Sequence, residues 1–316
     1  MEIHRTERDR MRAAVYDHYT QDPDEVVVRD VAEPKLFPGS VLIEVRAAGV
    51  NPVDWKVMAG YLEGLIDARF PVIPGWDVAG VVVGLGVDTP EFTIGDEVMA
   101  YARKDVVADG TFAERVAVSA HAVAHKPASL SWEQAGALPL AGGTALRTID
   151  ALGDLDGRTL LVHGAAGGVG ALAVQIAADR GARVIGTASE RNHEYLRGLG
   201  IVPVVYGEGL AERVRALAGG PVDAVADFVG GQLDTTLAVL RDGGPHASVA
   251  DATVPEHGGR SIWVRPDAAE TARLAALADA GRLRVEIAGT YPLDGVGDAF
   301  RASRTGHTRG KLVIVP

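Results

Sequence analysis

The chain has 316 residues, of which 47% are hydrophobic and 23% charged, with a formal net charge of −11. These proportions are typical of a globular protein with one large domain or two smaller ones, and a negative chain without a basic cluster argues against nucleic acid as a partner. The sequence contains no cysteine, which excludes disulfides and thiolate metal ligands. It also contains no apolar run of about 18 residues, and its charged start does not resemble a signal peptide, so we expect a cytoplasmic protein that does not engage a membrane.

The N-terminal part of the chain has the pattern of β structure. Residues 1–10 (MEIHRTERDR) are charged and lack a hydrophobic period, which predicts a disordered extension. Beyond them, short apolar runs alternate with Pro and Gly turns and predict strands at residues 26–28, 41–45, 78–83 and 112–118. Residues 11–126 are therefore predicted to form a compact, barrel-like β domain.

From Ser131 onward the pattern changes to alternating helices and strands. Ser131 and Gln134 have the spacing of a capped helix start, and the Ala- and Leu-rich run 135–149 follows them. Further strands are predicted at 160–162, 184–185, 222–229, 246–250 and 261–264, and helices at 233–241 and 268–280. The tail returns to a β pattern that closes on residues 311–315. An α/β domain over residues 127–262 is therefore expected, followed by a separate segment, 263–316.

The most informative stretch is the glycine-rich segment LLVHGAAGGVG, residues 160–170. An apolar run of strand length precedes it, and a helical period begins at Val169 after it. Strand, glycine turn, helix and strand form the βαβ unit that binds dinucleotides. A Cβ atom at Gly167 or Gly168 would keep a pyrophosphate away from the backbone N–H groups at the helix start. We therefore expect these two glycines to lie at the pyrophosphate.

The residues that follow the second strand of this unit indicate which dinucleotide is bound. Units that bind NAD place an acidic residue there to hold the ribose hydroxyls, but this chain has Ala188, followed by Ser189 and Arg191. A hydroxyl and a guanidinium suit a 2′-phosphate, so NADPH is predicted over NADH, with Glu190 turned to solvent. Tyr206 is expected to close over the adenosine side. The alternatives are a helix cap for Ser189 and an ordinary surface charge for Arg191.

Several blocks along the chain carry a resemblance to a known family. They are AGVNPVD (48–54), PGWDVAG (74–80), GDEV (95–98), GTFAE (110–114), LPLAGGTA (138–145), the turn at 165–170 and GHTRGK (306–311). In this order they resemble the zinc-independent quinone oxidoreductase (zeta-crystallin-like) branch of the medium-chain dehydrogenase/reductase superfamily. The resemblance covers residues 11–316. It implies a GroES-like β-barrel catalytic domain and a Rossmann domain, a doubly wound parallel sheet that binds NADP(H), with residues 263–316 returning to the catalytic domain.

The resemblance also predicts that the protein works without zinc. Zinc-dependent alcohol dehydrogenases of the superfamily have a Cys where Asn51 stands and a His where Trp76 stands, and neither replacement is a good zinc ligand. Without a Lewis acid, reduction of an acceptor that is already electrophilic is favoured over alcohol oxidation. We expect hydride transfer from NADPH to a quinone or to the activated C=C of an α,β-unsaturated carbonyl.

The resemblance assigns residues to the cofactor. It places Asn51 near the nicotinamide ribose or the substrate, and Thr144 near the nicotinamide. Val169 joins Gly167 and Gly168 at the pyrophosphate. Val229, the last residue of the run 222–229, is assigned to the cofactor site as well.

Two further residues are candidates for the acceptor oxygen. The ammonium of Lys56 would stabilise an oxyanion or anchor a cofactor phosphate, and Tyr61 would offer a phenolic O–H. The alternatives are a solvated charge for Lys56, a wall residue for Tyr61 and a proton supplied by water. Asn51 itself has the alternative of a simple turn residue. Three other polar residues are expected to be structural: Asp54 and Asp77 bracing their loops, and His163 packed at its strand end.

Other functions remain open at this level. A pathway-specific enoyl reductase and a catalytically silent, crystallin-like NADPH-binding protein would share the same motifs. The resemblance further implies a homodimer, for which the apolar run 261–264 is a candidate edge strand.

Overall fold

The structure, a computed structural model, describes residues 10–316. The predicted N-terminal extension lies outside the described residues, except for Arg10, which begins strand β1 (Arg10–Val15). The described chain forms two compact units. Unit 1 comprises residues 10–140, Arg265–Asp279 and Val285–Pro316, and unit 2 comprises Ala141–Val264 and Ala280–Arg284. None of the described helices is both long and apolar enough to cross a membrane.

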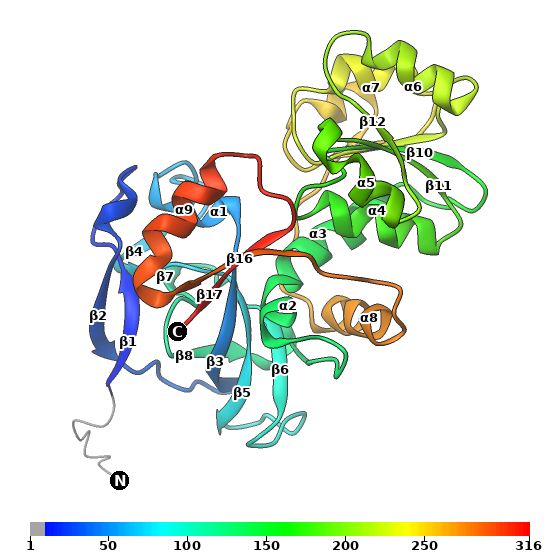
Figure 1. The fold of residues 1–316 in the computed structure, drawn as a ribbon. Helices are drawn as coiled ribbons and strands as arrows, with labels where there is room; N and C mark the ends of the chain where they lie inside the picture. The colour runs from blue at the N-terminus through cyan, green and yellow to red at the C-terminus, as the bar shows by residue number, and fades with distance from the viewer. Residues whose placement is uncertain (1–9) are drawn as a thin grey trace. The chain divides into compact units, whose positions relative to one another are not determined.

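Unit 1 is built on a seven-stranded sheet (Figure 1). Its strands follow the order β16-β17-β3-β5-β6-β9, and β8 pairs with residues 40–44 of β3. They are β3 (Ser40–Val50), β5 (Asp77–Leu85), β6 (Glu97–Tyr101), β8 (Arg115–Ser119), β9 (Val123–His125), β16 (Ile287–Pro292) and β17 (Lys311–Val315). Two short ribbons complete the β structure: β1 with β2 (Val27–Ala32), and β4 (Ala68–Ile73) with β7 (Val107–Asp109). The helices of unit 1 are α1 (Pro52–Met58), α2 (Trp132–Ala137), α8 (Ala268–Asp279) and α9 (Val296–Arg304).

The last strand of the chain, β17, lies between β16 and β3. β17 runs antiparallel to β3, with Leu312 opposite Val50 and Ile314 opposite Ala48. This register brings Lys311, at the start of β17, to the end of β3, where Asn51 follows. Two polar residues that are far apart in the sequence thereby become neighbours.

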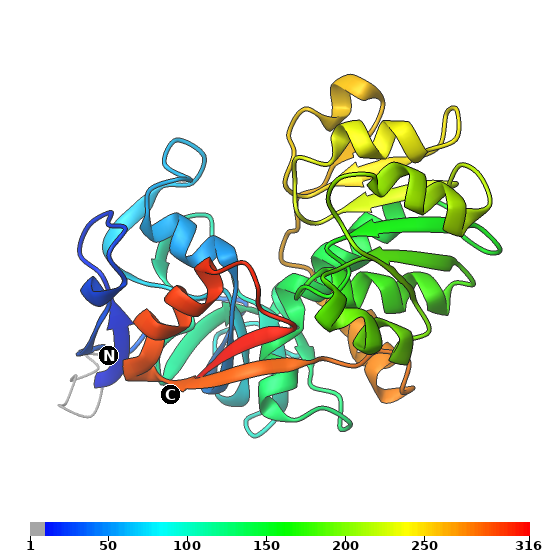
Figure 2. The same cartoon turned by 45° about the horizontal axis from the view of Figure 1, so that its top comes forward.

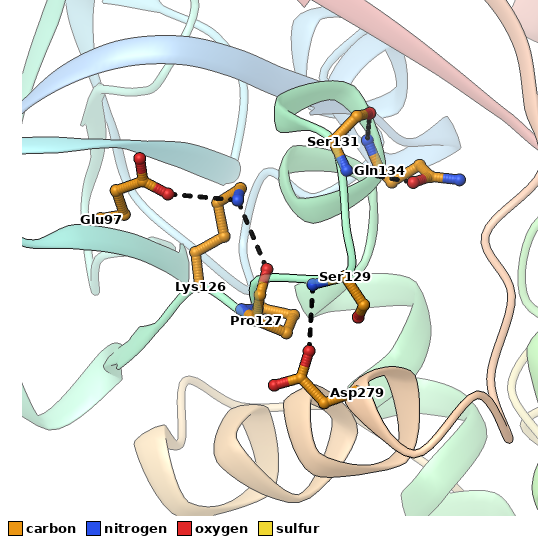
Figure 3. A network of polar contacts seen from close by, with 7 residues as sticks. All are labelled: Glu97, Lys126, Pro127, Ser129, Ser131, Gln134 and Asp279. Atoms are coloured by element: carbon orange, nitrogen blue, oxygen red, sulfur yellow. Dashed lines mark hydrogen bonds and ion pairs between the residues drawn. The ribbon is translucent and has the colours of Figure 1, made fainter.

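The segment that follows β9 is tied to unit 1 by polar contacts (Figure 3). The Lys126 ammonium lies 3.2 Å from a Glu97 carboxylate oxygen, and the Ser129 N–H donates to Asp279 over 3.1 Å. Ser131 and Gln134 form the predicted capping box, which begins α2. Residues 127–140 thus belong to unit 1, whereas the sequence places the domain boundary at 126/127; the chain passes into unit 2 within α3 (Pro139–Ala151).

Unit 2 contains a six-stranded parallel sheet with the order β12-β11-β10-β13-β14-β15. The strands are β10 (Thr159–His163), β11 (Arg183–Thr187), β12 (Val202–Val204), β13 (Ala224–Asp227), β14 (His246–Ser248) and β15 (Arg260–Ser261). Counted from β10, this is the order 3-2-1-4-5-6 of the dinucleotide-binding fold. The predicted Rossmann sheet is confirmed.

Helices cover both faces of this sheet (Figure 2). They are α4 (Gly170–Asp179), α5 (His193–Gly198), α6 (Leu210–Ala218) and α7 (Leu233–Val239), with α3 entering from unit 1. Leu161 and Ile185 share a buried cluster with Val214 of α6 and Val239 of α7. Because successive strand residues point to opposite faces, the neighbouring apolar positions of β10 and β11 face the other layer, where α4 packs.

Several predicted helices and strands differ from the structure in their bounds, and the strands predicted at 222–229 and 246–250 are the shorter β13 and β14. The helix expected over 135–149 is two helices, because Pro139 lacks an N–H and begins α3. The run 112–118 is a strand only from Arg115, since the Phe112 N–H bonds to the Pro74 carbonyl in a loop. The helix after the glycine turn begins at Gly170, one residue later than expected. The run 261–264 is in a strand only at Ser261: its neighbour β14 ends at Ser248, whose carbonyl accepts the Ile262 N–H over 2.9 Å, and the ladder stops there.

Candidate functional site

The glycine turn of unit 2 connects β10 directly to α4. Gly164 has φ +73°, a conformation that side chains disfavour, and its carbonyl accepts from the Gly167 N–H over 3.0 Å. A Cβ at Gly170 would collide with the Gly164 carbonyl oxygen and stand 2.8 Å from its carbon. The absence of a side chain at Gly170 therefore lets the helix begin against the turn.

Gly167 occupies the open side of the same turn. A Cβ there would meet only the Gly164 carbonyl oxygen, at 3.3 Å. The Ala171 N–H donates to the Gly167 carbonyl over 2.9 Å and the Leu172 N–H to the Val169 carbonyl over 3.1 Å, so the turn itself forms the start of the helix, where the positive end of the helix dipole lies. An open backbone surface at a helix start fits a pyrophosphate, and Gly167, Gly168 and Val169 are the residues that would hold it.

The end of β11 is fastened to this turn. Thr187 Oγ1 accepts from the Gly164 N–H over 2.9 Å, and the Thr187 carbonyl accepts from Ala165 over 3.0 Å. The Ala188 N–H in turn donates to Val204 at the end of β12. These bonds place residues 188–191 between the glycine turn and the segment that contains Tyr206.

The residues that would select the ribose lie in this segment. Ala188 is buried, Ser189 is half-buried, and Glu190 and Arg191 are exposed. Ser189 precedes a short 3-10 helix but makes no capping bond to its backbone; its Oγ accepts from the Asn192 side chain over 3.3 Å. The hydroxyl therefore does not serve as the helix cap that was its alternative interpretation. The Tyr206 side chain is also exposed.

A third loop reaches the glycine turn from β13. The Asp227 carboxylate is buried and accepts from the Val229 N–H over 2.9 Å and from Ser248 Oγ over 2.9 Å. Val229 is exposed, and its Cγ2 lies 2.6 Å from where a Cβ of Gly164 would stand. The structure thus brings the glycine turn, residues 188–191 and Val229 together at the carboxyl ends of the parallel strands β10, β11 and β13.

Thr144 and His163 occupy buried positions in unit 2. Thr144 lies on α3, and its carbonyl accepts from Thr148 Oγ1 over 2.8 Å. His163 ends β10, with Nε2 3.5 Å from Thr236 Oγ1. Burial lowers the pKa of His163 to about 4, against the opposing charge of Asp227. His163 is therefore a packed, neutral histidine at neutral pH, as the sequence predicts.

In unit 1, Asn51 stands where β3 ends and α1 begins. Its N–H donates to Asp54 Oδ2 over 2.7 Å, and its carbonyl accepts from the Asp54 N–H over 3.0 Å. Asp54 thus braces its own turn, as predicted.

The side chain of Asn51 is enclosed by charged groups. Its Nδ2 donates to Asp77 Oδ2 over 2.9 Å, and its Oδ1 accepts a hydrogen bond from the ammonium of Lys311. Asn51 is 2% exposed, Lys311 5% and Asp77 fully buried. Lys311 also donates to the Val50 carbonyl over 3.0 Å, and Asp77 Oδ1 accepts from the Leu140 N–H over 2.7 Å. We call Asn51, Asp54, Asp77 and Lys311 the Asn51 network.

Burial controls the protonation of this network. It raises the pKa of Asp54 to about 8 and that of Asp77 to about 6, although Lys311 opposes both shifts. Burial also lowers the pKa of Lys311, against the attraction of Asp77 and Asp54. At neutral pH, Asp54 therefore keeps its proton, while ionised Asp77 compensates the Lys311 ammonium.

Lys56 and Tyr61 lie outside this network. Both side chains are exposed, and both contact Trp55: the Tyr61 ring at 6.4 Å between centroids and the Lys56 ammonium at 5.6 Å from the indole. The Arg304 guanidinium lies over the same indole at 5.2 Å. Of the three predicted catalytic residues, Asn51 is thus the buried one.

Comparison with known proteins agrees with this architecture. Residues 37–128 match the family described as alcohol dehydrogenase GroES-like domain, and residues 199–314 match the family described as zinc-binding dehydrogenase. The chain is 33% identical to tomato (Solanum lycopersicum) 2-methylene-furan-3-one reductase, over 97% of this chain and 79% of the relative. It is 32% identical to the chloroplastic NADPH-dependent alkenal/one oxidoreductase of Arabidopsis thaliana, over 97% and 80%. The quinone oxidoreductase of Coxiella burnetii has a TM-score of 0.86 at 32% identity, over 97% of this chain and 99% of that structure.

The chain belongs to the quinone oxidoreductase branch of the medium-chain dehydrogenase/reductase superfamily. It is therefore an oxidoreductase that uses a nicotinamide cofactor, and the glycine turn of unit 2 is the part of the fold that fits its pyrophosphate.

The positions that bind zinc in other members of the superfamily are filled differently in this oxidoreductase. Asn51 is held by an ammonium and a carboxylate, and Trp76 is buried against Tyr101 with ring centroids 6.2 Å apart. Across residues 10–316, no group of three or more His, Cys, Asp or Glu side chains is placed to hold a metal ion.

Sequence reasoning missed the role of Lys311. The only available signal was its position in the block 306–311, to which no function was attached. It also expected Asp77 to brace its own loop, whereas Asp77 connects Asn51 to the first turn of α3.

Proposed function

We propose that this oxidoreductase uses NADPH to reduce a quinone or the activated C=C of an α,β-unsaturated carbonyl, without a metal. The observation that carries the proposal is the Asn51 network, which stands where zinc-dependent members bind their metal. The names of the tomato and Arabidopsis relatives, a methylene-furanone reductase and an alkenal/one oxidoreductase, support the enone class. The name of the Coxiella structure supports the quinone class.

The preference for NADPH rests on the segment after β11. A carboxylate that would repel a 2′-phosphate is missing at Ala188, and Ser189 and Arg191 follow at once. A guanidinium binds phosphate through charge-assisted hydrogen bonds. The exposed Tyr206 ring is proposed to cover the adenosine.

In this reaction the main task of the protein is to position the cofactor and the acceptor. When bound, the reduced nicotinamide supplies the hydride. Unit 2 holds the cofactor through Gly167, Gly168 and Val169, with Thr144 and Val229 proposed at the nicotinamide end. Hydride addition leaves negative charge on the acceptor oxygen, and the proton that neutralises it is proposed to come from Lys56, Tyr61 or water, since both side chains are open to solvent.

The direct test is to follow loss of the reduced-nicotinamide absorbance, using NADPH and NADH against a simple quinone and a simple enone, with enzyme-free blanks. Arg191→Glu should lower kcat/KM for NADPH by about 10- to 100-fold, the loss of one charge-assisted bond, and should leave NADH nearly unchanged. Arg197→Glu is the matched control, because Arg197 is also exposed but lies in the last turn of α5. A preference of the wild type for NADH would refute the assignment of Ser189 and Arg191.

Binding of NADPH without turnover would instead favour one of the alternative functions. These are a pathway-specific enoyl reductase that rejects simple acceptors, or a catalytically silent NADPH-binding protein. A panel of enoyl thioesters separates them, because only the reductase would oxidise NADPH.

A homodimer is proposed through the edge of the unit 2 sheet. β15 is the edge strand, and Trp263, two residues beyond it, is exposed. Light scattering that returns the mass of a single chain at micromolar concentration would refute this proposal.

A further inference from the structure

The Asn51 network contains more negative than positive side chains in a buried place. Asp54, Asp77 and Lys311 are all buried in unit 1, so one ammonium faces two carboxyl groups. A buried charge is costly unless it is paired. Lys311 and ionised Asp77 both bind the Asn51 amide and compensate each other's charge across it, and the proton on Asp54 removes the excess.

The contacts of Lys311 fix the orientation of one particular side chain. Its ammonium holds Asn51 Oδ1, while Asp77 Oδ2 holds Asn51 Nδ2. An amide that has a cation at its oxygen and an anion at its nitrogen has only one favourable orientation. Rotation of Asn51 by half a turn would bring its NH2 group against the ammonium.

The same pair also reaches the helix that carries Thr144. Asp77 Oδ1 accepts from the Leu140 N–H in the first turn of α3, and Thr144 lies one helical turn further along. A carboxylate at a helix start is favoured by the free N–H groups and the helix dipole. Asn51 and the start of α3 are therefore held by opposite oxygens of one carboxylate, which is itself compensated by Lys311.

We propose that Lys311 is a positioning residue for the reduction: through Asn51 and Asp77 it fixes the site that metal coordination organises in zinc-dependent members of the superfamily. The inference rests on the proposed function and deepens it, since it explains how a site without a metal keeps its geometry. Two buried charges that compensate each other add little net stability compared with apolar side chains of similar size. A role in orienting Asn51 accounts for its presence better than stability does.

The test separates charge compensation from positioning. Lys311→Met leaves Asp77 unpaired and Asn51 Oδ1 without its donor, so both the denaturation midpoint and kcat should fall. Lys311→Met with Asp77→Asn removes both charges, so the midpoint should recover. The bond to Asn51 Oδ1 remains missing in this double variant, so kcat should stay about 10- to 100-fold below the wild type. Lys311→Arg, which keeps a donor and a charge, should recover at least part of kcat.

Two measurements make the result specific. NADPH affinity, measured by fluorescence titration, should change less than about threefold in the double variant, because the glycine turn is untouched. Hydrogen exchange of the peptide that covers residues 48–58 should be faster than in the wild type, although global stability is equal. If the double variant recovers kcat together with stability, or shows wild-type exchange, Lys311 only compensates charge and the inference is wrong.

Failure of the proposed function gives a different pattern. A wild type that binds NADPH but reduces neither acceptor refutes the reductase, and the exchange comparison still decides whether Lys311 orders Asn51. An active wild type whose double variant matches it in kcat and in exchange refutes the inference alone.

Discussion

Two Gly→Ala substitutions in the glycine turn of unit 2 should separate cofactor binding from stability, because each adds one methyl group in a different environment. Gly167→Ala adds a Cβ whose only close neighbour is the Gly164 carbonyl oxygen at 3.3 Å. Gly170→Ala adds one that collides with the same oxygen and stands 2.8 Å from the Gly164 carbonyl carbon. The neighbours are backbone atoms in both cases, so they cannot rotate away as a side chain would.

The expected magnitudes differ accordingly. For Gly170→Ala, an overpacking cost of about 1–3 kcal/mol opposes a gain in helix propensity of up to about 1 kcal/mol, and contact with fixed backbone favours the upper cost. We expect a net loss of about 2 kcal/mol in the free energy of unfolding. For Gly167→Ala, the lower entropy of the unfolded chain stabilises by about 0.4–1 kcal/mol, so stability should stay within about 1 kcal/mol of the wild type.

Gly167→Ala, which should hardly change stability, should weaken NADPH binding. A methyl group at residue 167 keeps a phosphate from at least one N–H group, and a hydrogen bond to a charged group is worth about 1.5–3 kcal/mol. The Kd for NADPH should therefore rise about 10- to 100-fold in Gly167→Ala. Urea denaturation followed by circular dichroism and titration of NADPH fluorescence measure the two effects. Gly198→Ala, in the same unit with no atom within 4 Å of the added Cβ, is the control. Wild-type affinity in a folded Gly167→Ala would refute the pyrophosphate assignment.

Two further predictions concern pH. Burial raises the pKa of Asp54 to about 8, so the native state keeps a proton that the unfolded chain has lost, and stability should fall as pH rises from about 4 to about 8. Asp77 and Lys311 titrate beside it, so Asp54→Asn should flatten this fall without abolishing it, and an unchanged slope of denaturation midpoint against pH would contradict the prediction. Burial lowers the pKa of His163 to about 4, so the unfolded chain takes up a proton first and stability should fall as pH drops from about 6.5 to about 4. His163→Gln should lose less stability over that range in the same denaturation series, and an equal loss would show that other groups cause the acid sensitivity.

The glycine turn could be predicted from the sequence because its information is local. Its strand, turn and helix lie within residues 159–179, and each glycine answers a steric demand of its neighbours. The residue after β11 could be read for the same reason, at a fixed distance from the turn. Distant packing partners have little influence on these positions, so the predicted start of α4 differs from the observed start by one residue.

The Asn51 network depends on contacts that local pattern does not reveal. Lys311 and Asn51 are separated by 260 positions, and their bond exists because β17 pairs with β3 in one particular register. A shift of one residue would turn Lys311 to the other face of the sheet. The strand predicted at 261–264 is shorter in the structure for a related reason. The length of β15 depends on where its neighbour β14 ends and not on the apolar character of 262–264.

The charge of the Asn51 network limits the chemistry that this site performs. With Asp54 protonated and Asp77 ionised, the negative charge of Asp77 balances the positive charge of the Lys311 ammonium. No net positive charge remains to stabilise an alkoxide. Zinc at the equivalent place polarises its substrate directly as a Lewis acid. A site organised by two opposite charges that are joined through Asn51 supplies orientation instead, so the acceptor must carry its own electrophilicity. Quinones and conjugated carbonyls meet that condition, because their oxygen receives the charge that hydride addition creates. Oxidation of a simple alcohol runs in the other direction and needs its alkoxide to be stabilised, so adding zinc should leave the protein without alcohol oxidation, since neither Asn51 nor Trp76 is a good zinc ligand.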